Sequence, residues 1–139
     1  MNEDRASGGT IVQPEGWSAP RGYSNAIAAS GRYVVLAGQI GWNPETQLIE
    51  ATDFAGQARQ ALQNIVTLLA EAGARPLDLV RLTWYILDRD EYMAARRELG
   101  DAWKEVFGDH YPAMSVVVVS GLLEAKARLE IEATAVVED

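Results

Sequence analysis

Five side chains in this sequence stand out as candidates for binding a small polar molecule or moving a proton. Glu130 and Glu132 carry carboxylates, and Arg21 and Tyr23 carry a guanidinium and a phenol close together in the chain. His110 is the one histidine, and an imidazole transfers protons near neutral pH. Each residue also has a purely structural interpretation. The glutamates alternate with apolar residues, as on the solvated face of a strand, and the other three are typical of loops. The residue types alone leave both interpretations open.

Composition excludes several classes of protein. The chain has 139 residues, no cysteine and one histidine, which excludes thiol catalysis and sulfur-ligated metals, so we expect no metal and no cofactor. A net charge of -8 repels polyanions, and no basic stripe is present, so nucleic acid is not an expected partner. No apolar run approaches the roughly 18 residues that span a bilayer. We therefore expect a soluble, cytoplasmic protein without a membrane partner.

The hydrophobic pattern predicts a single domain over 13–139, after a flexible lead-in over 1–12 that is rich in serine, glycine and charge. Two extended runs, 26–29 and 33–40, flank a turn that contains a glycine, which is typical of a β-hairpin. The domain is therefore expected to begin with two paired strands.

Apolar residues at three- and four-residue spacing predict two helices, over about 54–72 and 90–107. In the second helix, Trp103 is assigned to the buried face, and Arg96 and Arg97 to a solvated edge. Alternation and valine content predict three further strands, one between the helices and two after them. These strands are expected at 80–87, 114–119 and 128–137.

The predicted order is ββαβαββ, which indicates an α+β fold with a mixed sheet. Right-handed crossovers would place both helices on one face of that sheet. Something else must then cover the opposite face, and we interpret the valine run Val116–Val119 as a buried strand. In a two-layer protein of this size, the cover is expected to be another subunit. We therefore predict a homo-oligomer in which sheets pack against one another.

Five short motifs occur in order on these predicted elements. They are Gly22-Tyr23-Ser24-Asn25-Ala26, Gly38-Gln39-Ile40, Gln60-Ala61-Leu62-Gln63-Asn64, Tyr111-Pro112-Ala113 and Glu130-Ile131-Glu132-Ala133. Over about residues 17–137 the sequence resembles the RidA family, also called YjgF/YER057c/UK114. The resemblance implies a chorismate-mutase-like fold, a homotrimer and ligand clefts at the subunit interfaces. The best-known members hydrolyse reactive enamines and imines, such as 2-aminoacrylate, to a 2-oxo acid and ammonia.

The resemblance also implies roles for individual residues. Tyr23, Gly38 and Glu130 match positions that line the family's cleft, where the glutamate is thought to orient or activate the attacking water. In the deaminases an arginine follows Tyr-Pro-Ala and grips the substrate carboxylate in a bidentate pair. This sequence has Met114 there, and a thioether cannot replace a guanidinium. The family's asparagine after the central strand corresponds to Asp90. The carboxylate anchor is therefore expected to differ from that of the deaminases.

Three further residues near these motifs are candidates for a binding role. Arg21 lies two residues before Tyr23, and His110 directly precedes Tyr111, so either can reach the cleft if its loop folds back over it. Trp42 follows the Gly38 motif and can form a pocket wall or an interface anchor.

The leading hypothesis is an enamine/imine deaminase-like hydrolase that releases ammonia from a small 2-imino acid or a 2-aminomuconate-type enamine, with Glu130 orienting water. The alternative is a non-catalytic small-molecule-binding trimer, because Met114 and Asp90 make the inferred site less positive and more apolar than the family norm. Endoribonuclease activity, reported for some relatives, is least favoured, because the chain is acidic and has no histidine pair.

Overall fold

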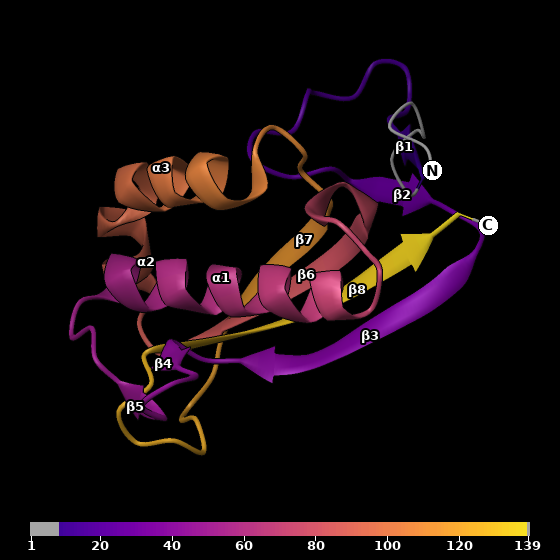
Figure 1. Cartoon of the computed structure of the whole chain (residues 1–139). Coiled ribbons are helices and arrows are strands. Elements are labelled where there is room, and N and C mark those ends of the chain that lie inside the picture. The colour runs from indigo at the N-terminus through magenta and orange to yellow at the C-terminus, as the bar shows by residue number, and fades with distance from the viewer. Residues whose placement is uncertain (1–8, 139) are drawn as a thin grey trace.

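The computed structural model describes residues 9–138, which fold into two layers (Figure 1). One layer is a four-stranded sheet with the strand order β3-β8-β6-β7. Its strands are β3 (Arg32–Gln39), β6 (Leu79–Ile86), β7 (Ala113–Val118) and β8 (Leu129–Val137). β6 and β7 run parallel, whereas β8 is antiparallel to both of its neighbours, β3 and β6. The predicted mixed sheet is therefore confirmed.

The helices form the other layer and pack on one face of the sheet, as predicted (Figure 1). α1 (Phe54–Glu71) begins after Asp53, whose carboxylate accepts a hydrogen bond from the Gly56 backbone N–H at 3.0 Å. Leu62 and Ile65 of this helix are fully buried, and burial of each such side chain stabilises the fold by about 1.5–3 kcal/mol. No helix among residues 9–138 is long and apolar enough to cross a bilayer.

The second predicted helix, over 90–107, is broken into two. These are α2 (Arg89–Ala94) and α3 (Arg96–Phe107). They meet at Ala95, whose φ of -93° and ψ of 0° lie outside the helical region. At the junction, Arg96 Nε donates a hydrogen bond to the Met93 carbonyl oxygen at 3.2 Å. Neither glycine nor proline occurs at this point, so no local signal in the sequence predicted the break.

The predicted hairpin over 26–40 is wrong. β2 (Ala26–Ala28) pairs antiparallel with β1 (Thr10–Val12), and β3 pairs with β8 instead. Ser24 forms an isolated parallel bridge with Ala113 at the start of β7. The segment that enters β2 therefore lies at the β7 edge of the four-stranded sheet, and β3 lies at the opposite edge.

Gly31 is the glycine that suggested a tight turn. Its φ of 142° favours glycine, and a Cβ atom here would overlap the Val137 carbonyl. The glycine therefore lets the chain pass closely over the end of β8 as it enters β3.

The predicted lead-in over 1–12 lies mostly outside the described residues, which begin at Gly9. Its last three residues form β1. Besides β1, the described residues form three further short elements that the sequence did not predict. They are β4 (Trp42–Asn43), β5 (Leu48–Ile49) and the 3-10 helix Pro76–Asp78. β4 and β5 pair as a hairpin, and Asn64 of α1 donates a hydrogen bond to the Trp42 carbonyl oxygen at 2.9 Å. This bond fixes the hairpin to the helical layer.

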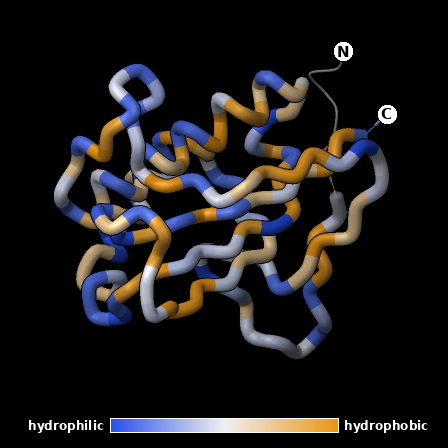
Figure 2. The backbone as a smooth tube through the Cα atoms, turned by 90° about the horizontal axis from the view of Figure 1, so that it is seen from below, coloured by the Kyte–Doolittle hydropathy of each residue, from blue (hydrophilic) through white to orange (hydrophobic). Residues whose placement is uncertain are grey.

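The face of the sheet opposite the helices is uncovered in a single chain. The run Val116–Val119 was predicted to be buried, but Val117 is 41% exposed and Val118 is 56% exposed. Val117 lies on the open face of the sheet, which meets no second layer. Val118, opposite the buried Ile86, lies on the helical side of β7, an outer strand that the helices leave partly uncovered. Figure 2 shows hydrophobic segments along neighbouring strands. Burial of this surface would require a further chain.

Candidate functional site

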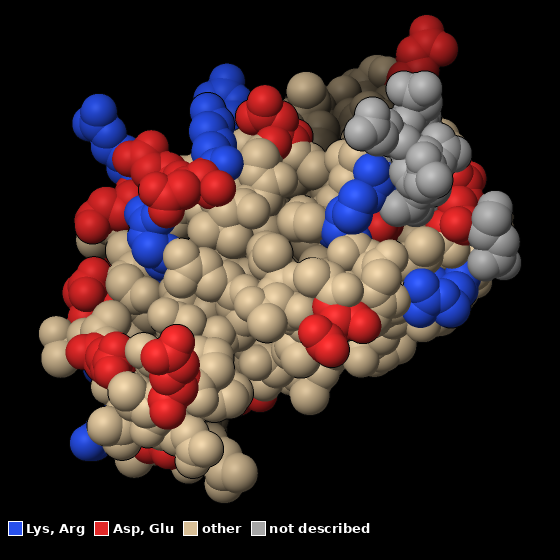
Figure 3. All heavy atoms as spheres, in the orientation of Figure 1, with Lys and Arg blue, Asp and Glu red and all other residues tan. Residues whose placement is uncertain are grey.

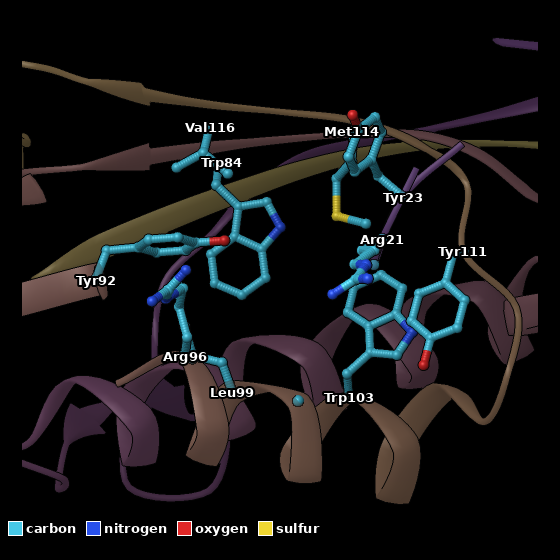
Figure 4. A pocket seen from close by; sticks show the side chains of 12 residues that line it. Arg21, Tyr23, Trp84, Tyr92, Arg96, Leu99, Trp103, Tyr111, Met114 and Val116 are labelled. Carbon is cyan, nitrogen blue, oxygen red and sulfur yellow. The ribbon is translucent and has the colours of Figure 1, made fainter. Parts of the chain in front are cut away.

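Five aromatic side chains line a cavity of about 260 Å³ between α3 and the β7 edge of the sheet (Figure 4). We call it the aromatic pocket. Its aromatic lining consists of Tyr23, Trp84, Tyr92, Trp103 and Tyr111. Met114 and Val116 of β7 also line this cavity. Segments distant in the sequence therefore converge on one concave surface of mainly apolar character.

Strand register explains why the β7 side chains point toward the helices. Met114 lies opposite Leu82 in the parallel β6–β7 pair, and Val116 lies opposite Trp84. Leu82 and Trp84 are buried under the helical layer. Partners in register project to the same face of a sheet, so Met114 and Val116 face α3.

Contacts among the rings hold the aromatic pocket in shape. The Trp103 and Tyr111 rings stack with centroids 5.8 Å apart and planes inclined by 11°. Trp103 Nε1 donates a hydrogen bond to the His110 carbonyl oxygen at 3.1 Å. On the other side, Tyr92 meets Trp84 edge-on at 6.1 Å. Burial raises the pKa of Tyr92, which the positive charge of Arg96 partly opposes, so the phenol remains protonated at neutral pH.

Two guanidinium groups, those of Arg21 and Arg96, line the same pocket, and no carboxylate of residues 9–138 does so. Among residues 9–138, neither arginine forms an ion pair with an acidic side chain. Trp84 adds a further donor, because its Nε1 atom is buried without a hydrogen-bond partner in the described chain, and the residue is only 4% exposed. The pocket thus combines an apolar lining with unused hydrogen-bond donors.

Sequence reasoning missed Arg96, which it assigned to a solvated edge. The side chain is exposed, but it also lines the pocket beside Tyr92 and Leu99 (Figure 4). A signal was available, because Arg96, Leu99 and Trp103 follow the three- and four-residue spacing of one helical face. Trp103 itself is 5% exposed, which confirms its predicted burial.

A second cavity, of about 420 Å³, lies beside the β3–β8 pair, and we call it the glutamate pocket. Gly38, Trp42, Glu124 and Glu130 are among its lining residues. The Glu130 carboxylate rests against Gly38, where a Cβ atom would overlap it. Glycine at position 38 therefore determines where this carboxylate lies.

The two pockets lie on opposite faces and at opposite edges of the sheet. Glu130 pairs with Tyr85 and alternates with Leu129 and Ile131, which are fully buried under the helices. Its side chain therefore points to the uncovered face, whereas Met114 points toward the helices. Because the two side chains point to opposite faces of the sheet, the described part of a single chain does not bring Glu130 and Met114 into one cavity.

Comparison with known proteins identifies the family. Residues 16–137 match the family model described as Endoribonuclease L-PSP. The 2-iminobutanoate/2-iminopropanoate deaminase of Escherichia coli is 34% identical over 124 residues, which cover 81% of this chain and 92% of that protein. The chain belongs to the RidA family.

Solved structures of RidA-family proteins have the same fold, which confirms the predicted chorismate-mutase-like architecture. The Rid protein YyfB of Yersinia pestis is 31% identical, with a TM-score of 0.82 and coverage of 94% of this chain and 99% of that one. Escherichia coli TdcF, solved with bound serine, is 30% identical, with a TM-score of 0.69 and coverage of 93% and 99%.

The candidate site residues named from the sequence fall into three groups in the structure. The aromatic pocket contains Arg21, Tyr23 and Met114, and the glutamate pocket contains Gly38, Trp42 and Glu130. Asp90 and His110 line neither pocket.

Both outlying residues have local partners. Asp90 is exposed at the start of α2, with its carboxylate 3.4 Å from Arg89. His110 Nε2 lies 2.7 Å from the Leu79 carbonyl oxygen, so this nitrogen must carry the proton and donate it. The histidine thereby ties the loop before β7 to β6.

Glu132, interpreted as a solvated residue, is exposed as predicted. It accepts a hydrogen bond from the Tyr85 hydroxyl at 2.5 Å, and this bond raises the pKa of Tyr85. No group of three acidic or histidine side chains within residues 9–138 is placed to hold a metal ion.

Proposed function

We propose that this protein is an enamine/imine hydrolase whose site is completed between copies of the chain in a homotrimer. The observation that carries the proposal is the separation of the two pockets. Donors and apolar surface lie at the β7 edge, and a carboxylate held against Gly38 lies at the β3–β8 edge. A neighbouring copy that presents its β3–β8 edge to β7 would bring the two halves together. Family membership supports this arrangement.

The chemistry requires few groups. An imine carbon becomes electrophilic once its nitrogen is protonated, and the demanding steps are placing water and transferring protons. Glu130 accepts a proton from water as the water oxygen bonds to the imine carbon. A proton then passes to the amine nitrogen, the carbon–nitrogen bond breaks, and the hydroxyl becomes a carbonyl. One imine and one water give one 2-oxo acid and one ammonia, so the reaction requires no electron carrier.

Tyr23 is proposed to donate a hydrogen bond to a substrate oxygen. It lines the aromatic pocket, and the neighbouring Ser24 N–H donates to the Pro112 carbonyl oxygen at 3.0 Å. That bond holds the loop of Tyr23 against the start of β7. In this arrangement the phenol comes from one copy and Glu130 from the next.

The test is ammonia release from freshly generated 2-iminobutyrate. We expect the protein to accelerate ammonia release over buffer. Glu130→Gln should reduce the rate at least about 100-fold, because it replaces the proton-accepting carboxylate with an amide of similar shape that cannot act as a base. Glu132→Gln is the matched control, since it makes the same change two residues away on the same strand face. Absence of acceleration, or equal loss in both variants, would contradict the proposal.

A non-catalytic binding protein is the second candidate, and Met114 favours it. The thioether lies in the aromatic pocket at the position where the deaminases are expected to have their carboxylate-binding arginine. If the wild-type protein is inert toward 2-iminobutyrate and Met114→Arg gains activity, the natural chain is a binding protein. If the wild type is active, this candidate is wrong.

Endoribonuclease activity is not proposed, although the family description contains that word. The chain has 20 acidic and 12 basic residues, and in Figure 3 the basic side chains form no continuous stripe on the face shown. A polyanionic backbone would find little electrostatic attraction there.

A further inference from the structure

We infer that the aromatic pocket takes a substrate with an aromatic ring and a carboxylate, and that Arg96, Arg21 and the Trp84 N–H hold the carboxylate in place of the residue at position 114. This inference rests on the proposed function, because it names the substrate class of the same site. It goes further by assigning the anchor to residues on α3, β6 and the loop before β2.

The charge of the lining selects an anion. Arg21 and Arg96 both line the pocket, and no acidic side chain in the described part of the chain does. The chain as a whole has a net charge of -8. Two cations that form no ion pair within residues 9–138 make a local positive site in an otherwise acidic protein. Arg96 Nε is occupied by the Met93 carbonyl oxygen at 3.2 Å, which orients the guanidinium and leaves its terminal nitrogens to a ligand.

The unpaired indole N–H of Trp84 is the second, independent observation. Buried donors are almost always paired, and an indole nitrogen can only donate. Figure 4 shows this ring directed into the cavity near Met114. A ligand oxygen at this point would satisfy the donor. Because the lining offers donors and few acceptors, the ligand must supply acceptor oxygens, as a carboxylate does.

The remaining surface of the pocket selects a ring. Trp84, Tyr92 and Trp103 present aromatic faces or edges, and Leu99 and Met114 fill the gaps between them. The volume of about 260 Å³ falls just below the roughly 300–1,000 Å³ of drug-sized sites, which favours a compact ligand with one ring. A two- or three-carbon imino acid could engage the guanidinium groups but would leave the aromatic walls without contact.

The experiment measures binding without turnover. Phenylpyruvate, the stable 2-oxo acid, is titrated into the protein by calorimetry, beside pyruvate, which lacks the ring, and 4-phenyl-2-butanone, which lacks the carboxylate. We expect phenylpyruvate to bind at least tenfold more tightly than either comparison compound. Equal affinity for pyruvate and phenylpyruvate would overturn the inference, as would a failure of phenylpyruvate to bind.

Variants then locate the carboxylate. Arg96→Gln should weaken phenylpyruvate binding at least tenfold, and Trp84→Phe, which keeps a ring but loses the N–H, should weaken it several-fold. Arg97→Gln is the matched control. Arg97 is the next residue in the chain and carries the same charge, but its side chain does not line the pocket. Equal weakening by Arg96→Gln and Arg97→Gln would show a general charge effect and overturn the assignment.

The two proposals fail in different ways. Phenylpyruvate binding with the expected variant pattern, in a protein that releases no ammonia from 2-iminobutyrate, contradicts the hydrolase and supports the pocket assignment. Ammonia release that depends on Glu130, without phenylpyruvate binding, contradicts the pocket assignment alone.

Discussion

The aromatic pocket and the glutamate pocket are opposites in charge and in lining. Among the described residues, the first is lined by two arginines and five aromatic side chains without a carboxylate, whereas the second is lined by Glu124 and Glu130 without a basic residue. One can hold an anion but offers no carboxylate base, and the other offers a base but nothing that attracts an anion. Each lacks what the other supplies. Because they lie at opposite edges of one sheet, the difference favours a site assembled from two copies over two separate sites.

The largest expected effect comes from mixing chains that are damaged in different pockets. Gly100 lines the aromatic pocket, and a Cβ atom there meets nothing within 4 Å, so Gly100→Phe can place a ring in the cavity. Glu130→Gln disables the other pocket. Each variant alone should release almost no ammonia. If sites are shared between copies, a refolded equimolar mixture should recover about a quarter of the wild-type rate, because one site in four receives two intact halves.

The control for this mixture uses two lesions in the same pocket. Glu130→Gln and Gly38→Ala both alter the glutamate pocket, so their refolded mixture should release ammonia no faster than the mean of the two variants measured separately. If the mixture of Gly100→Phe and Glu130→Gln recovers no ammonia release, the two pockets do not combine between copies, and both halves of the site must come from one chain.

Local signals predicted the helical layer well, because the physical cause of a helix is local. The Asp53 cap and the apolar spacing of α1 lie within one stretch of chain, and the structure places α1 within one residue of the expected end. Strand pairing was harder, because β3 pairs with β8, about a hundred residues later in the chain. A glycine between two extended runs cannot distinguish a hairpin from two strands that belong to different sheets.

Part of the candidate site was also within reach of the sequence. Gly38 and Glu130 were singled out together, and the structure brings them into contact. Arg96 was missed because helical periodicity assigns a face to a residue but does not say where a long side chain ends. The unpaired Trp84 donor could not be predicted, since whether a buried N–H finds a partner depends on residues from several elements.

A smaller effect is expected from a methyl group in the glutamate pocket. In Gly38→Ala the new Cβ would overlap the Glu130 carboxylate, so the carboxylate must move away from β3, against which it now rests. We expect ammonia release to fall at least about tenfold, because proton transfer requires close placement. Displacement of this flexible side chain from its rotamer should also lower the free energy of unfolding, by about 0.5–1.5 kcal/mol, measured by denaturant titration.

A double-mutant cycle sharpens this prediction. In a Glu130→Ala background the obstructing carboxylate is absent, so Gly38→Ala should cost little stability. An equal cost in both backgrounds would mean that the glycine serves the backbone of β3 and does not determine the position of Glu130.

The smallest expected effect is the same substitution in the aromatic pocket. Gly100 lies in the interior of α3, and a Cβ atom there is unobstructed. Gly100→Ala should therefore raise the free energy of unfolding by about 0.5–1 kcal/mol, because alanine loses less backbone entropy than glycine in a helix. Phenylpyruvate affinity should stay within about twofold of wild type, because one methyl group leaves the arginines and Trp84 in place.

Gly38 thus makes room for a carboxylate, whereas Gly100 only leaves space at the wall of the aromatic pocket. If Gly100→Ala lowers the free energy of unfolding, the wall of the aromatic pocket is already tightly packed. The pocket would then lack the space that the inferred ligand requires.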